Sequence, residues 1–157
     1  MKVQLVLKGL FFLLCVICTG CREPPLKDFT FSYTAESINS YKFIVTIHSD
    51  STYQIEKFNY YMDNIERKQR PEIRSGRLTG GQFKTLKVRL EESNLFSMND
   101  SYGFEKGETR WSTSSDIIHQ VYFSMAGKEK FVTCNNSAEL PASFIRLVKF
   151  VNTLLSD

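Results

Sequence analysis

One cysteine near the C-terminal end and two histidines are the residues of this 157-residue chain that could support nucleophilic chemistry. Cys134 ends an apolar run, and His48 and His119 lie in other segments with strand-like alternation. A cysteine nucleophile needs a neighbouring base, and imidazole is a common one. The sequence spacing brings neither histidine to Cys134, and a free cysteine otherwise behaves as a small hydrophobic residue. We expect Cys134 to be buried and inert, with an enzyme that uses Cys134 and a histidine base as the alternative.

Other catalytic and metal-binding motifs do not occur in the sequence. It contains no G-x-S-x-G nucleophile motif, no P-loop and no G-x-G-x-x-G dinucleotide motif. A zinc site takes cysteine and histidine pairs at short spacing, whereas the two histidines stand far apart and are better explained as core or surface residues. We therefore expect no catalytic set, no metal and no cofactor.

The charge balance argues against a nucleic-acid partner. The chain has 20 Lys and Arg residues against 17 Asp and Glu residues, a formal charge of +3. Lys2 and Lys8 belong to an N-terminal segment that we expect to be removed, which leaves a nearly neutral domain. Proteins that bind nucleic acid usually carry a clustered basic surface.

Residues 1–20 have the composition of a secretory signal. Two lysines precede the uncharged run Gly9–Gly20, which is well short of the roughly 20 apolar residues of a membrane-spanning helix. The boundary at the end of this run, Cys18-Thr19-Gly20-Cys21, resembles the lipobox of bacterial lipoproteins. The resemblance implies cleavage between Gly20 and Cys21, and attachment of diacylglycerol and a further acyl chain such as palmitate to Cys21. The alternative is an ordinary cleaved signal with an incidental cysteine.

The residue after Cys21 bears on the destination of such a lipoprotein. In the best-known sorting scheme an Asp at this position retains the protein at the inner membrane, and here the residue is Arg22. The resemblance therefore implies a lipid-anchored protein of the bacterial cell envelope, at the outer membrane rather than the inner, with its domain outside the cytoplasm. Cys15 and Cys18 would leave with the signal, so Cys134 would remain as a single thiol and no intramolecular disulfide would form.

The segment from Ser97 to Asp116 is the candidate partner-binding region. It is long and weakly periodic, and such segments are often functional. Tryptophan and arginine are enriched in interface hot spots. The candidate contact residues are Tyr102, Phe104, Arg110 and Trp111. A buried Trp111 that seals one edge of the sheet is the competing interpretation.

The surrounding pattern predicts the elements that would position these residues. Alternation predicts strands over residues 29–33, 41–47, 52–61, 73–78, 117–125 and 128–134, and apolar spacing predicts helices from Thr79 to about Asn94 and from Pro141 to Leu155. Strands grouped in hairpins with few helices predict an α+β domain. We expect an antiparallel sheet built from hairpins, with two amphipathic helices packed on one face. The expected organisation is a signal peptide over 1–20, a lipidated tether over 21–28 and a single domain over 29–157.

This arrangement resembles uncharacterised small envelope lipoproteins of bacteria. The residues that carry the resemblance are the lipobox, Leu78–Phe83, Asn94–Phe96 and Pro141–Leu147. It implies a fold and an address but no activity. We expect a non-catalytic domain that binds an envelope protein or glycan, with membrane contact through the N-terminal lipid. The alternatives are the Cys134 enzyme and an inhibitor or immunity-type protein.

Overall fold

The computed structural model describes residues 26–37, 40–60, 71–104 and 117–154. The strands are β1 (Phe29–Ser37), β2 (Tyr41–His48), β3 (Thr52–Asn59), β4 (Glu72–Arg77), β5 (Ser101–Tyr102), β6 (Ile117–Met125) and β7 (Lys128–Asn135). The helices are α3 (Gly80–Ser93) and α4 (Ala142–Thr153), with a 3-10 turn at Leu95–Ser97. Together they form an α+β fold, as the sequence predicts.

The strands form one seven-stranded sheet in the order β4-β3-β2-β1-β6-β7-β5. The neighbours from β4 to β7 pair antiparallel, and β6 and β7 form a hairpin whose turn residues Ala126 and Gly127 both have positive φ. Such a pair of positive φ angles is typical of a two-residue type I′ turn, which matches the twist of the strands.

The expectation of a purely antiparallel sheet is wrong at one edge. β5 runs parallel to β7, with Ser101 opposite Thr133, so the sheet is mixed. The backbone N–H of Thr133 donates to Asp100 O, which fastens this two-residue strand to the sheet edge. A strand this short has no periodicity of its own, so alternation could not reveal it.

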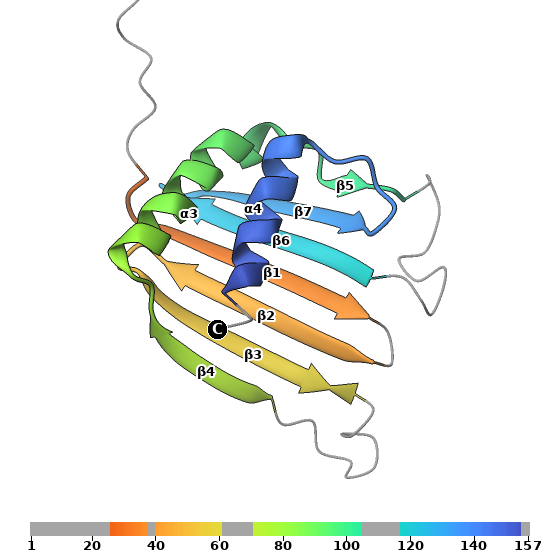
Figure 1. Ribbon diagram of the computed structural model, residues 1–157. Helices are drawn as coiled ribbons and strands as arrows, with labels where there is room; N and C mark the ends of the chain where they lie inside the picture. The colour runs from red at the N-terminus through yellow and green to blue at the C-terminus, as the bar shows by residue number, and fades with distance from the viewer. Residues whose placement is uncertain (1–25, 38–39, 61–70, 105–116, 155–157) are drawn as a thin grey trace, which may run out of the picture.

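Alternation along the central strand separates the two faces of the sheet. Every odd-numbered residue of β1 is buried, and every even-numbered residue is half-buried. The buried set shares one core with Leu86 and Leu90 of α3 and with Phe144, Leu147 and Val151 of α4. Both helices therefore pack on one face, and Figure 1 shows them lying across the sheet there.

The start of α3 is fixed by the capping box that the sequence predicts. The Gln82 backbone N–H donates to Thr79 Oγ1, and the Thr79 backbone N–H donates to Gln82 Oε1. The helix ends at Asn94, whose φ of 45° is the left-handed conformation common after a helix.

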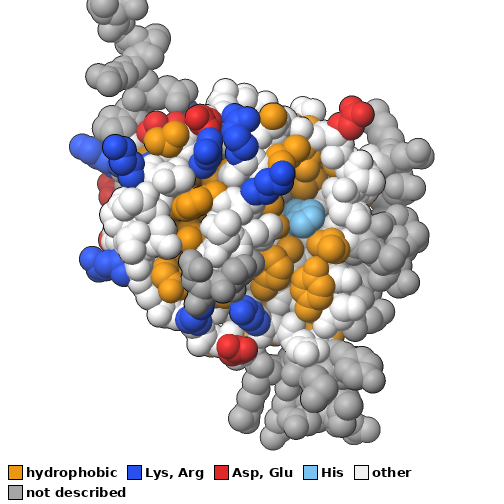
Figure 2. All heavy atoms as spheres, in the orientation of Figure 1, with side chains coloured by type: hydrophobic (Ala, Val, Ile, Leu, Met, Phe, Trp, Pro, Cys, Tyr) orange, Lys and Arg blue, Asp and Glu red, His pale blue; other side chains and the backbone are white. Residues whose placement is uncertain are grey.

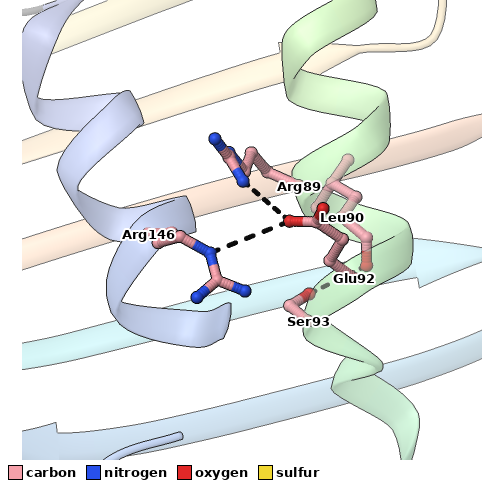
Figure 3. A network of polar contacts seen from close by, with 5 residues as sticks. All are labelled: Arg89, Leu90, Glu92, Ser93 and Arg146. Atoms are coloured by element: carbon pink, nitrogen blue, oxygen red, sulfur yellow. Dashed lines mark hydrogen bonds and ion pairs between the residues drawn. The ribbon is translucent and has the colours of Figure 1, made fainter. Parts of the chain in front are cut away.

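One carboxylate joins the two helices at their exposed surface (Figure 3). The Glu92 carboxylate of α3 lies 2.8 Å from Arg89 Nη1 and 3.9 Å from Arg146 Nε of α4. Behind it, the buried Ser93 hydroxyl donates to Leu90 O. Because these charges are partly exposed, we assign them little of the stability, and the apolar core between helices and sheet supplies more.

Several predicted features lie outside the described residues. They include the signal over 1–20, most of the tether over 21–28, and residues 105–116 of the long segment. Within the described part of the chain, no helix is long and apolar enough to cross a membrane.

Candidate functional site

A tyrosine and a histidine form a hydrogen-bonded pair on the helix-bearing face of the sheet. Tyr33 lies in β1 and is fully buried, and its hydroxyl is 2.8 Å from His119 Nδ1 in β6. Their rings are stacked, with centroids 6.0 Å apart and planes 6° from parallel. The register puts His119 directly opposite Ala35, so Tyr33 is its diagonal neighbour on the same face.

Asn152 of α4 is a third polar side chain that acts on the Tyr33 hydroxyl. Burial raises the pKa of Tyr33 well above its ordinary value, and a hydrogen bond with Asn152 lowers it by a smaller amount. Tyr33 therefore stays protonated at neutral pH. With the hydroxyl assigned as the donor to His119 Nδ1, the imidazole proton is on Nε2.

Cys134 lies beside His119. The β6–β7 register places it directly opposite His119, and its side chain is only 1% exposed. Burial raises the pKa of the Cys134 thiol to about 11, and burial also lowers the pKa of His119. At neutral pH these shifts favour a neutral thiol beside a neutral imidazole. Because the thiolate is the nucleophilic form, they disfavour nucleophilic attack by Cys134.

His48 is far from this cluster. It lies at the end of β2, on the opposite face, where it is exposed and its Nδ1 is 3.4 Å from Thr30 Oγ1. Of the two histidines considered as a base for Cys134, only His119 is a neighbour of the thiol.

Two more aromatic side chains pack beside Tyr33. Phe43 packs edge-on against Tyr33, and Tyr41 stacks on Phe43 and is 37% exposed. Val148 and Asn152 are one helical turn apart on α4 and so lie on one stripe of that helix. Figure 2 shows hydrophobic side chains gathered around a histidine at the surface of this face. We call Tyr33, Tyr41, Phe43, His119 and Asn152 the aromatic cluster.

Two buried polar atoms near the end of α4 are left without a hydrogen-bond partner among the described residues. They are Asn152 Oδ1 and Arg74 Nε, although Arg74 Nη2 donates to Leu154 O. A buried acceptor without a partner costs free energy, and binding sites tolerate that cost because a ligand group supplies the partner.

The structure gives partial information on the predicted partner-binding residues. Tyr102 lies in β5, half-buried against the core, and its hydroxyl accepts from the Asn99 backbone N–H. Phe104 follows and is half-buried. Arg110 and Trp111 lie outside the described residues, as do Gly20 and Cys21. Tyr102 is thus committed in part to the sheet edge, and the grouping of all four candidates stays a prediction.

Sequence reasoning missed Tyr33, Asn152 and their link to His119. A tyrosine at an inward position of a strand needs a partner for its hydroxyl, and an asparagine next to the apolar stripe of the last helix is a candidate. Those two signals could have suggested the pair, but only the strand register brings in His119.

The described residues contain no group of three or more His, Cys, Asp or Glu side chains that could hold a metal ion. No protein-family model and no curated protein matches the chain. Its function is therefore inferred from its own residues.

Proposed function

We propose that this protein is a lipid-anchored lipoprotein of the bacterial envelope whose single domain is a non-catalytic binding module. The anchor is carried by the Cys18-Thr19-Gly20-Cys21 boundary after the uncharged run. Several acyl chains, at about 0.8 kcal/mol per buried methylene, make such attachment effectively permanent.

The observation that favours binding over catalysis is the state of Cys134. Its thiol is buried, with a pKa raised to about 11, and the neighbouring imidazole is also biased towards its neutral form. The aromatic cluster beside it has what a binding site needs: apolar area, one imidazole N–H and one amide oxygen without a partner among the described residues. The proposed partner is an envelope protein or glycan, and the proposed contacts of the long segment are Tyr102, Phe104, Arg110 and Trp111.

The direction of β1 separates the anchor from the aromatic cluster. The described chain starts at Leu26 and enters β1 at Phe29, whereas Tyr41 pairs with Ser37 at the other end of that strand. At about 3.3 Å per residue, a strand of this length spans roughly 26 Å. A protein tethered through Cys21 would thus hold Tyr41 away from the bilayer.

Cell fractionation tests the anchor. We expect the protein to sediment with the outer membrane, and Cys21→Ser to release the domain into the soluble envelope fraction or leave it unprocessed. Arg22→Asp should move the protein towards the inner membrane while keeping its lipid. Recovery of a processed Cys21→Ser, cleaved after Gly20, with the outer membrane in the same amount as the wild type would contradict the proposal.

A Cys134-dependent enzyme is the second candidate, because the register brings His119 directly opposite Cys134. It requires the thiol to become a thiolate when a substrate binds. The rate at which Cys134 is alkylated in the folded protein separates the two candidates.

A further inference from the structure

The chain is held firmly where it leaves the domain towards Cys21. Leu26 is buried in the core, and Phe29 O accepts a hydrogen bond from Ser49 N. The Phe29 ring stacks on Phe83 in the first turns of α3, with centroids 6.1 Å apart. The exit point is therefore a fixed place on the surface, between α3 and the start of β1.

Four lysines surround that exit point. Lys27 follows Leu26 and is exposed. On α3, Lys84 follows Phe83 directly and Lys87 lies one turn later, with its Nζ 5.8 Å from the centre of the Phe83 ring. Lys128 is exposed at the start of β7, opposite Met125, which itself lies opposite Phe29. We call these four residues the anchor corner.

Carboxylates near the anchor corner lie on the sheet side rather than on the start of α3. Asp28 and Glu129 adjoin Lys27 and Lys128, and the exposed Asp50 follows Ser49, whose N–H donates to Phe29 O. The first turn of α3 has no acidic residue. The Glu129 carboxylate accepts a hydrogen bond from the Tyr122 hydroxyl. Tyr122 lies opposite Ser32, so its side chain is on the sheet face away from the helices. Lys84 and Lys87 therefore have no acidic residue in the first turn of α3 beside them, so the side of the exit point that α3 covers carries their positive charge.

An exposed apolar side chain lies among these lysines. Val88 is 42% exposed and stands four residues after Lys84, so the two share one stripe of α3. Lysines beside an apolar side chain suit the headgroup region of a bilayer, where the ammonium groups meet phosphates.

The length of the tether limits how far this corner can be from a membrane. Residues 22–25 separate Cys21 from Leu26. At 3.3–3.6 Å per residue these five steps reach at most about 18 Å even when fully extended. A tether this short keeps the exit point near the headgroups, where electrostatic attraction decays over about 8 Å at physiological salt.

We propose that the anchor corner is a docking surface for anionic phospholipid headgroups, so that the lipidated protein rests on the membrane with α3 and the start of β1 towards the bilayer. This inference rests on the proposed lipid anchor at Cys21. It orients the domain, and it turns the Tyr41 end of the sheet away from the membrane.

Lysine labelling of the full lipidated protein tests the orientation. The protein is reconstituted in vesicles of phosphatidylcholine alone or mixed with phosphatidylglycerol, and an amine-reactive reagent is followed by peptide mass spectrometry. Lys27, Lys84, Lys87 and Lys128 should label several-fold more slowly in the anionic vesicles. The protection should vanish in roughly 1 M salt, where the Debye length falls to about 3 Å. Lys57 and Lys149, exposed elsewhere, should label equally in both vesicles.

A charge reversal with a matched control sharpens the test. Lys84→Glu with Lys87→Glu should abolish the lipid-dependent protection of Lys27 and Lys128, whereas Lys149→Glu should preserve it. Equal labelling of all lysines in both vesicles, by a protein whose mass shows acylation, would overturn the docking surface and leave the anchor standing. A protein whose mass shows no acylation would overturn both proposals.

Discussion

Burial controls the acid–base behaviour of the residues around Tyr33. The Tyr33 hydroxyl is hydrogen-bonded with His119 Nδ1, and Cys134 lies opposite the same histidine on the neighbouring strand. The neutral forms of Tyr33, His119 and Cys134 are favoured because burial in the protein interior penalises charge. A cluster of neutral donors and acceptors beside aromatic rings is suited to binding.

The pKa of His119 makes stability depend on pH. An unfolded histidine takes up its proton near pH 6.5, at about its ordinary pKa, whereas burial lowers the pKa of folded His119. Between the two values the unfolded state binds more protons, so the free energy of unfolding should fall as the pH drops below about 6.5. Urea denaturation between pH 8 and pH 5 should show a smaller fall for His119→Gln than for the wild type. His48→Gln, which changes the exposed histidine, is the control, and an unchanged fall in His119→Gln would contradict the account.

The reactivity of Cys134 separates binding from catalysis. A pKa of about 11 against an ordinary 9.0 lowers the thiolate fraction at neutral pH by about 100-fold. Alkylation of the Cys134 peptide should be slower than that of a model thiol by at least this factor in the folded protein, and should reach the model rate in urea. Rapid alkylation of folded protein below pH 7 would instead support the Cys134 enzyme.

At the scale of single elements, the capping box should contribute measurably to α3. Thr79→Ala removes the acceptor for the Gln82 N–H and should lower the free energy of unfolding by about 1 kcal/mol. Thr85→Ala, which removes an exposed hydroxyl bonded to Gly81 O inside the same helix, should cost much less. Chemical denaturation of both variants checks the difference, and equal losses would show that the cap contributes nothing special.

Local signals explain which elements could be predicted. The spacing of Thr79 and Gln82 predicts the start of α3, and alternation predicts the β2–β3 and β6–β7 hairpins, because these depend on residues near one another in sequence. The two-residue β5 has no such signal, and its parallel pairing depends on the path of the chain. The same limit applies to the aromatic cluster, because Tyr33, His119 and Asn152 meet only through strand register and helix packing.

At the scale of the whole molecule, the sheet links two surfaces with different roles in the proposed function. The anchor corner lies where β1 begins, and Tyr41 lies where β1 ends. A short tether at one end and a binding cluster towards the other would present the cluster to partners in the envelope. The lipid on Cys21 is the premise on which this arrangement depends.

The intact mass of the protein extracted from a bacterial membrane fraction tests that premise most directly. The account predicts a chain that begins at Cys21 and carries diacylglycerol and acyl groups, and it predicts that Cys21→Ser lacks this species. An unmodified soluble product in the wild type would contradict the lipid anchor and the membrane-facing corner, and would leave the α+β fold and its aromatic cluster unchanged.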